Sequence, residues 1–330
     1  QQFGDTYYVT FNAEDDTPGL LKLQYVEGAY ASPKDPIWEN TDVTYSGSAL
    51  FEAGKYTFLL TDVAGNTHIE IRKFGESAEK EEEFRAVWIS YLEFKSSGYT
   101  KKAFQEHVET MFNEIAAMNM NAVVVHVRPF GDAMYPSDYF PWSRYVSGKQ
   151  GKDPGFDPLE IMVREAHERG LEFHAWLNPY RVSSGTTDVT TLSADNPARI
   201  YRTDKNKAND RNVLTYSGQL YYNPASKEVQ ELLVNGIREI IINYDVDGIH
   251  FDDYFYPSLG KNYASNFDAT EYNAYKKQKI AAKQPYLSIA DWRRENVNTL
   301  VRNVYSAIKR IDKNVVFGIG PGGFMDALKA

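Results

Sequence analysis

Two consecutive carboxylates end a short apolar run within residues 246–257. Asp247 and Gly248 form a turn before this run, and Asp252 and Asp253 close it ahead of several aromatic residues and a proline. A carboxylate at the end of a buried strand is costly unless it is partnered or used in chemistry. In parallel β/α folds, the carboxyl end of a strand is where active sites lie. Asp252 and Asp253 are therefore a candidate acid–base pair.

The alternation of side chains along a strand separates these two carboxylates. His250 and Asp252 are expected on one side of the strand, and Asp253 on the other unless the strand has already ended. In a barrel, the side shared by His250 and Asp252 would be the interior, with Asp252 at the mouth. Asp252 is thus the stronger catalytic candidate, while Asp253 could bind a ligand or simply cap the following turn.

Polar residues also lie at the ends of two earlier apolar runs. Alternation puts His126 and Arg128 on one face of the first run, and His174, Trp176 and Asn178 on one face of the second. Arg128, Asn178 and Asp252 would then meet at a common rim. The candidates just beyond that rim are Tyr180, Arg181, Asp253, Tyr254 and Tyr256.

Several of these candidates have a simpler interpretation. Arg128 could serve only as the ion-pair partner of Asp252, and Asn178 could belong to a plain turn with Pro179. Trp142 and Tyr139 could stack on a sugar or merely cover the rim. The sequence leaves these alternatives open.

Three of the six histidines lie on the predicted strands, which raises the possibility of a metal site. His126, His174 and His250 together with Asp252 would be ligands suited to a metal-dependent hydrolase. His174, however, lies four residues before the end of its strand and should sit deeper than the mouth. A buried, hydrogen-bonded layer of histidines is favoured, and the sequence indicates neither a bound metal nor a cofactor.

The elements that must position these residues are strands alternating with helices over residues 84–330. Buried strands are predicted at 84–90, 122–128, 171–177, within 246–257, and at 315–319, with amphipathic helices between them. Successive β-α-β units with long loops after the strands predict a parallel sheet of the (β/α)8 TIM-barrel type. Because only about five of eight units are found, the barrel is expected to be incomplete and the natural protein to continue past Ala330.

The first 75 residues have a different pattern, with short alternating runs separated by turn residues. This pattern predicts a small all-β sandwich domain acting as a spacer or accessory module. Residues 54–67 resemble the closing hairpin of bacterial immunoglobulin-like domains of cell-surface proteins. Residues 76–83 are almost entirely polar and mostly acidic, and they are expected to be a solvated linker.

Composition narrows the classes of partner. The formal net charge of −9 argues against nucleic acid, which requires a basic surface. Aromatic residues make up 14% of the chain; such rings commonly stack on sugars, and the alternative is that they form a tyrosine-rich core and surface. No apolar run is long enough to span a membrane. The chain begins at Gln1, which fits an exported protein whose signal peptide has been removed, or a cloned fragment; the expected location is extracellular or in the cell envelope.

From about Phe84 onward the chain resembles the glycosyl-hydrolase-like family ten of bacterial proteins, a (β/α)8 family. The resemblance is carried by residues 84–89, 127–135, 175–181, 222–225 and 247–257. It implies a secreted or cell-envelope protein like a glycosidase, and at least one member of the family is thought to cleave peptidoglycan glycan strands. It also implies further strands, absent from this chain, which could contribute catalytic residues.

The resulting hypothesis is a glycoside hydrolase acting on a bacterial or environmental polysaccharide, with peptidoglycan glycan strands as the first choice. Asp252 would be one catalytic carboxylate, acting as nucleophile or base and held ionised by Arg128. The second carboxyl group would come from another loop, and the remaining candidates would bind sugar hydroxyls or an acidic substituent. The alternative is a non-catalytic carbohydrate-binding barrel; a metal-dependent hydrolase is the third choice. The oligomeric state cannot be predicted.

Overall fold

The chain forms two compact units, residues 1–83 and residues 84–330. The computed structural model describes residues 2–3, 6–10, 22–30, 32–41, 43–44, 48–52, 54–62, 64–74, 83–252, 254–259 and 267–320. Asp253 and nearly all of the predicted linker at 76–83 lie outside these ranges. Each unit is described by itself.

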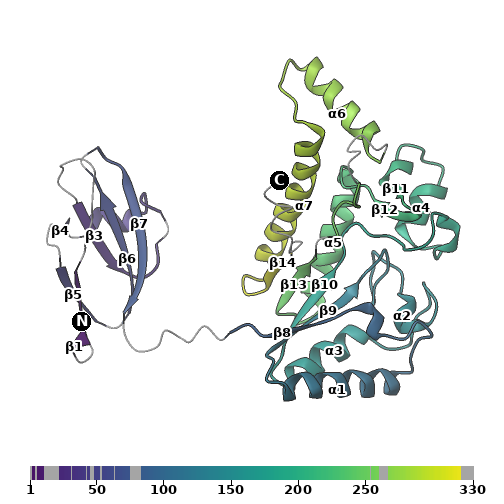
Figure 1. Cartoon of the computed structure of the whole chain (residues 1–330), viewed down its shortest axis with the longest axis horizontal. Coiled ribbons are helices and arrows are strands. Elements are labelled where there is room, and N and C mark those ends of the chain that lie inside the picture. Colours follow the sequence, from purple (N-terminus) through teal and green to yellow (C-terminus); the bar gives the residue numbers. More distant parts are fainter. Residues whose placement is uncertain are drawn as a thin grey trace. The chain divides into compact units, whose positions relative to one another are not determined.

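The first unit contains two antiparallel sheets (Figure 1). One sheet has the order β1-β2-β5, with bounds Gln2–Phe3, Thr6–Thr10 and Ser48–Glu52. The other has the order β4-β3-β6-β7, with bounds Val43–Thr44, Lys22–Glu27, Gly54–Thr61 and Thr67–Phe74. The 3-10 helix η1 spans Pro36–Asn40. Leu23, Phe51 and Phe58 form a small core.

The second unit is built on a parallel sheet whose spatial order follows the chain (Figure 1). Its five strands are β8 (Ala86–Ile89), β9 (Ala122–Arg128), β10 (Glu172–Leu177), β13 (Gly248–Phe251) and β14 (Val316–Ile319). These are the five predicted strands. Within the described residues β8 and β14 are the sheet edges, so this part of the chain is an open sheet.

Helices connect these strands. The α-helices are α1 (Lys101–Ala117), α2 (Arg144–Ser147), α3 (Pro158–His167), α4 (Pro197–Thr203), α5 (Lys227–Asn243), α6 (Ala269–Ala281) and α7 (Ile289–Ile311). Short 3-10 helices, η2 (Tyr91–Glu93), η3 (Val189–Thr191) and η4 (Asp210–Asn212), and a hairpin of β11 (Val213–Tyr216) and β12 (Gln219–Tyr222) complete the unit. No helix in the described ranges is long and apolar enough to cross a membrane.

Local sequence explains the start of α3, which follows β9. The Asp157 carboxylate accepts hydrogen bonds from the backbone N–H groups of Leu159 and Glu160, and Pro158 occupies the first turn. These contacts satisfy N–H groups that the helix itself leaves unpaired. Asp157 is thus the N-cap of α3.

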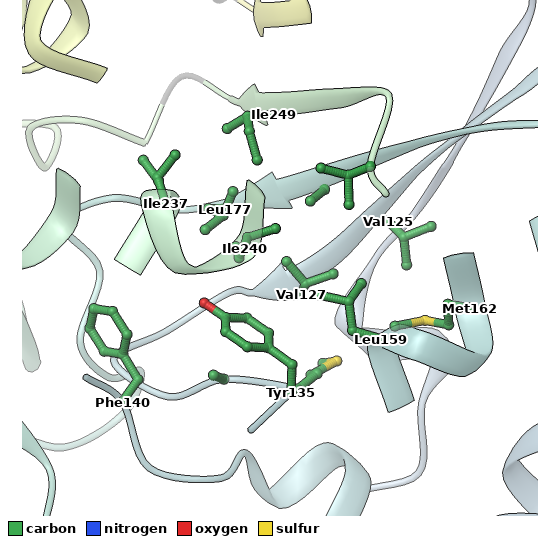
Figure 2. Packing of buried hydrophobic residues seen from close by; sticks show 14 of the residues in the cluster. Val125, Val127, Tyr135, Phe140, Leu159, Met162, Leu177, Ile237, Ile240 and Ile249 are labelled. Carbon is green, nitrogen blue, oxygen red and sulfur yellow. The ribbon is translucent and has the colours of Figure 1, made fainter. Parts of the chain in front are cut away.

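One face of the parallel sheet packs on the helices. Val125, Val127, Leu177 and Ile249 project from three strands into a buried cluster (Figure 2). Leu159 and Met162 of α3, Ile237 and Ile240 of α5, and Tyr135 and Phe140 of the loop after β9 meet them there. This face is the hydrophobic core of the unit.

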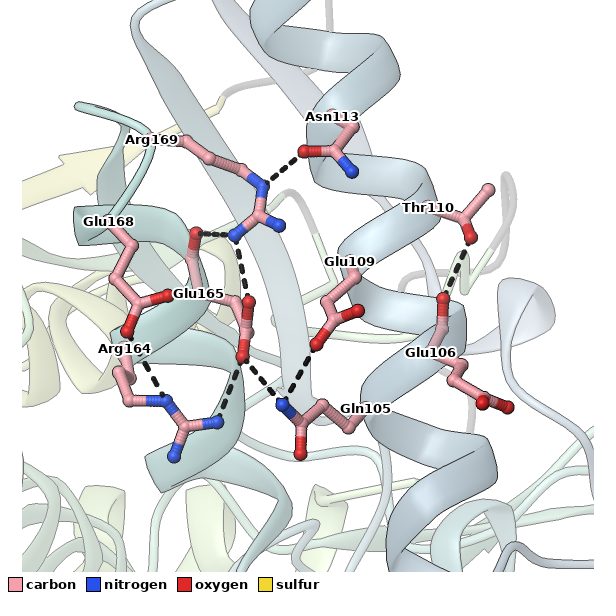
Figure 3. A network of polar contacts seen from close by, with 9 residues as sticks. All are labelled: Gln105, Glu106, Glu109, Thr110, Asn113, Arg164, Glu165, Glu168 and Arg169. Carbon is pink, nitrogen blue, oxygen red and sulfur yellow. Dashed lines mark hydrogen bonds and ion pairs between the residues drawn. The ribbon is translucent and has the colours of Figure 1, made fainter.

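Helices α1 and α3 are also joined on their outer sides by a polar network (Figure 3). Its centre is Glu165, which is buried and accepts hydrogen bonds from Arg164, Arg169 and Gln105. Arg169 in turn donates to the side-chain oxygen of Asn113 on α1. A buried carboxylate surrounded by donors in this way is a structural element.

Candidate active site

Asp252 lies directly after β13, at the carboxyl end of the parallel sheet. Its Oδ2 atom accepts a hydrogen bond from Nε1 of Trp176 at 3.2 Å, and its Oδ1 atom accepts one from the backbone N–H of Tyr254 at 2.9 Å. Only 8% of the residue is exposed. Because an indole N–H can only donate, it favours a carboxylate that acts as acceptor. The side chain is thus held in one orientation by two donors.

Trp176 belongs to the sheet face opposite the helices. Its ring stacks on the imidazole of His126, with centroids 3.2 Å apart, and meets the edge of Trp88 at 4.7 Å. Trp88 also contacts His250, at 4.5 Å between centroids. Parallel register explains the arrangement, because Trp176 pairs with both His126 and His250 on the neighbouring strands. Asp252 therefore stands at the end of a surface made of tryptophan and histidine.

His126 is held as a neutral ring. Its Nδ1 atom accepts a hydrogen bond of 3.3 Å from the backbone N–H of Tyr91. Burial lowers the pKa of His126 to about 3, and the positive charge of Arg181 acts in the same direction. Burial likewise lowers the pKa of His250 to about 4. At neutral pH both rings are uncharged.

Arg181 supplies a cation beside this surface. Its guanidinium lies over the ring of Phe130 on one side, at 4.9 Å, and over the ring of Tyr254 on the other, at 5.0 Å. Phe130 packs edge-on against Tyr91, at 5.1 Å. These residues therefore form a closed ring in which each one contacts the next; this set is called the rim ring. Its members are Trp176, Asp252, Tyr254, Arg181, Phe130, Tyr91 and His126.

The expectation that His126 and Arg128 share a face is wrong. The pairing of β9 with β10 shifts between Trp176, which pairs with His126, and Leu177, which pairs with Arg128. Val127 is therefore an extra residue on β9 that has no partner on β10. Past this bulge the alternation of β9 is reversed relative to β10, so Arg128 falls on the face opposite His126. Arg128 consequently projects toward the helices, where its guanidinium lies over the ring of Phe140 at 4.6 Å.

Arg128 does not hold Asp252 ionised by contact. It is fully buried, and its three side-chain nitrogens have no hydrogen-bond partner. Burial lowers the pKa of Arg128, and nearby Tyr135, Tyr222 and Asp132 act against that change. In this structure Arg128 cannot reach a substrate on the Asp252 side.

Two other candidates, Asn178 and Tyr180, are also buried. Asn178 is 1% exposed and donates a hydrogen bond of 3.2 Å to the carbonyl of Pro129, which ties two loops together. Tyr180 is fully buried, and burial raises the pKa of its hydroxyl well above the ordinary value. Their expected role in binding sugar hydroxyls does not fit this burial.

Tyr256 and Trp142 lie in hollows outside the rim ring. Tyr256 accepts a hydrogen bond from Asn296 and lines a hollow of about 470 Å³ with Pro257 and Arg293. Trp142 lines another, of about 600 Å³, beside Glu239. Tyr139 is also outside the rim ring. Among the predicted site residues, the structure brings together Asp252, Trp176, His126, Tyr254 and Arg181.

The three strand histidines do not converge on one point. His174 pairs with Glu172, at 2.9 Å from Nε2 to Oε2, and its ring lies across Gly248 of the next strand. His250 lies across Gly318 in the same way. In the described part of the chain no group of three or more His, Cys, Asp or Glu side chains could hold a metal ion. The metal-hydrolase alternative finds no support there.

Three members of the site were not singled out from the sequence. Trp88 could have been found, because it lies opposite Val124 and thus on the same face as His126. Tyr91 and Phe130 follow their strands in irregular segments, where alternation has no predictive value. Their places are set by the loops.

Residues 83–329 match the family Glycosyl hydrolase-like 10. The chain belongs to this family. It is 41% identical over 273 residues to glycosyl hydrolase YngK of Bacillus subtilis, covering 81% of this chain and 50% of that protein. It is 35% identical over 226 residues to glycosyl hydrolase DigH of Escherichia coli K12, covering 66% of this chain and 48% of that protein.

The chain spans about half the length of these two relatives. Among solved structures, it resembles alpha-L-fucosidase isoenzyme 2 from Paenibacillus thiaminolyticus with a TM-score of 0.44 and 18% identity, over 71% of this chain and 32% of that one. It resembles the alpha-galactosidase AgaA from Geobacillus stearothermophilus with a TM-score of 0.41 and 12% identity, over 84% and 38% of the two chains. Family membership supports a function of the glycoside hydrolase type.

Proposed function

We propose that this chain is part of a secreted or cell-envelope glycoside hydrolase of the TIM-barrel type, with Asp252 as one of its catalytic carboxylates. The observation that carries the proposal is the setting of Asp252. It ends β13 at the carboxyl edge of a parallel sheet, and Trp176 and Tyr254 orient it with two hydrogen bonds. Family membership supports the reaction class.

The chemistry of glycoside hydrolysis assigns a role to this carboxylate. Glycosidases use two carboxyl groups across the scissile bond, about 5–5.5 Å apart in retaining enzymes and about 6.5–9.5 Å apart in inverting enzymes. Asp252, which accepts from two donors, suits the ionised role of nucleophile or base. The proposal places the second carboxyl group, the acid, on another loop.

The tryptophan and histidine surface beside Asp252 provides the means to hold a sugar. Trp88 is 46% exposed, so its ring is accessible for stacking on a pyranose face. The neutral imidazoles of His126 and His250 each have a buried Nε2 atom without a hydrogen-bond partner in the described structure. Because these atoms are buried, the two imidazoles support the surface from within instead of reaching a sugar on it. Peptidoglycan glycan strands are the first substrate to test, and the N-terminal β unit is proposed to be an immunoglobulin-like spacer.

The proposal is tested by incubating the full-length protein with purified peptidoglycan and with panels of plant and host glycans, followed by mass spectrometry of the products. Asp252→Asn should lower the rate of hydrolysis by at least about 100-fold with the fold intact, as expected for loss of a group that acts directly in the reaction. Asp245→Asn is the matched control, because the Asp245 side chain is 99% exposed and lies outside the rim ring.

Three results would contradict parts of the proposal. Full activity of Asp252→Asn would remove Asp252 from the mechanism. Binding of a glycan without any turnover would favour the alternative, a carbohydrate-binding barrel without catalysis. Inhibition by chelators, with activity restored by a divalent metal, would bring back the metal-dependent hydrolase.

A further inference from the structure

Arg181 is partly exposed and has no hydrogen-bond acceptor among the described residues, whereas Arg128, which also lacks an acceptor, is fully buried. Arg293 pairs with the buried carboxylate of Asp268, and Arg199 donates to the carbonyl of Leu192. Arg144 donates to the hydroxyl of Tyr145 at 3.1 Å. Within the described residues, by contrast, the Arg181 side chain makes no hydrogen bond or ion pair. In the described part of the chain its guanidinium makes cation–π contacts with two aromatic rings.

The two rings fix the plane of this guanidinium. Phe130 comes from the loop after β9, and Tyr254 from the loop after β13, so Arg181 bridges two loops from a third. The Nε atom is buried without a partner, whereas the two terminal nitrogens are not buried. Arg181 is therefore an oriented cation that presents its terminal N–H groups to solvent.

Arg181 also lies close to Asp252. Tyr254 contacts both residues, since its backbone N–H donates to Asp252 while its ring lies under the guanidinium. The charge of Arg181 is near enough to His126 to lower the pKa of that ring. A ligand lying on the tryptophan and histidine surface would thus have Asp252 and Arg181 along the same edge.

We propose that Arg181 binds a carboxylate carried by a sugar unit of the glycan next to Asp252, so that the site selects acidic glycans. The inference rests on the proposed function and names its substrate class. A planar guanidinium matches a carboxylate with two parallel hydrogen bonds, and such bonds are about twice as strong as those to neutral groups. A neutral hydroxyl would leave the cation without a counter-charge.

The carboxylate could belong to a uronic acid or to a lactyl ether, and the probes separate these sources. One pair is an oligosaccharide of alternating N-acetylglucosamine and N-acetylmuramic acid, with its carboxylates free or converted to methylamides. The other pair is an oligosaccharide of alternating N-acetylglucosamine and glucuronic acid, free or amidated. Binding is measured calorimetrically with the Asp252→Asn chain, in which hydrolysis does not interfere.

The free acid of one pair should bind about 10- to 100-fold more tightly than its amide, the range expected for charge-assisted hydrogen bonds. Arg181→Gln should weaken binding of the free acid alone, so that acid and amide bind with equal affinity. Arg181→Lys should restore part of the preference for the acid. Arg144→Gln is the matched control, because Arg144 also stacks on a ring, at 5.0 Å from Tyr145, but already has an acceptor. The Arg144→Gln variant should keep the full preference for the free acid over the amide.

The inference is overturned if acid and amide bind equally, if neither binds, or if Arg181→Gln weakens both forms by the same factor. Stronger competition by inorganic phosphate than by acetate would also overturn it, because the site would then be one for phosphate. Its failure is distinguishable from that of the proposed function. Equal hydrolysis of acid and amide removes only the carboxylate selectivity, whereas acid-dependent binding without hydrolysis removes only the catalytic proposal.

Discussion

The two faces of the parallel sheet differ in chemistry although alternate residues of the same strands build both. Toward the helices, the strands present aliphatic and phenylalanine side chains such as Val125, Phe173 and Ile249, all with no exposed surface. On the other face they present His126 and Trp176. The first face packs on the helices and also buries the guanidinium of Arg128. The second carries polar atoms that the described protein groups leave unpaired, which is costly unless a ligand or water uses them.

A second contrast concerns two charged groups. Glu165, between α1 and α3, is surrounded by three donors (Figure 3). Arg181, at the rim ring, has aromatic rings on both sides and no acceptor in the described structure. A buried charge whose partners all lie within the protein stabilises the fold, whereas an oriented and partly exposed charge without partners is available for recognition. Arg181, not Glu165, is therefore the charged group to test for ligand binding.

Truncation on the helix-facing side should give the largest loss of stability. Phe173→Ala removes a fully buried ring and should cost about 3–5 kcal/mol, because the cavity cannot collapse completely. Trp88→Ala, on the opposite face, should cost much less because the ring is 46% exposed. Urea unfolding of both variants checks the comparison. Equal losses would show that the two faces contribute alike to folding.

Replacing the glycines that lie against the histidine rings by alanine should have the next largest effect on stability. A Cβ at position 248 would overlap the His174 imidazole, so Gly248→Ala should destabilise the chain by about 1–3 kcal/mol. The double variant Gly248→Ala/His174→Ala should recover most of the loss. Gly318→Ala is the matched case, since its Cβ would lie 2.6 Å from Nδ1 of His250. If the double variant gave no recovery, the close approach of ring and glycine would not be the cause.

Trp176→Phe should affect catalysis more than folding. It keeps an aromatic ring against His126 but removes the N–H that bonds to Asp252. We expect kcat on a hydrolysed glycan to fall about tenfold, the equivalent of about 1.4 kcal/mol for a hydrogen bond to a charged group. The thermal midpoint should change little. An unchanged kcat would mean that Tyr254 alone suffices to orient the carboxylate.

The pH dependence of stability compares two buried groups that act in opposite directions. The folded-state pKa of His126 is about 3, below the ordinary value of 6.5. As the pH falls below 6.5, the unfolded chain binds a proton that the folded chain does not, so stability is lost toward pH 3 with a slope of at most about 1.4 kcal/mol per unit. The buried carboxyl of Asp132, whose pKa burial raises to about 6, acts in the opposite direction.

A variant without the His126 imidazole separates the contribution of His126 to the pH dependence of stability from that of Asp132. His126→Gln removes one titrating ring and should give a flatter stability curve than the wild-type chain between pH 6.5 and pH 4. Chemical unfolding at several pH values measures this difference. Parallel curves would show that His126 is not kept neutral by folding.

Regular alternation accounts for what could be predicted about the site. The five strands, their order and the placement of His126, Trp176 and Asp252 near one another follow from apolar runs and a period of two residues. The prediction failed at Arg128, since a single irregularity in the pairing of β9 with β10 moved the guanidinium to the other face. The burial of Asn178 and Tyr180 could not be predicted either, because it depends on loops that close over them.

The sequence by itself determined the alternation of strands and helices, the carboxylate at the end of β13 and the family resemblance, because these depend on residues close together in the chain. Only the tertiary structure decided that Asp252 receives a hydrogen bond from Trp176, 76 positions away. It also decided that Arg181 lies between Phe130 and Tyr254. The physical reason is that strand register and loop packing, set by contacts between distant residues, fix which side chains meet.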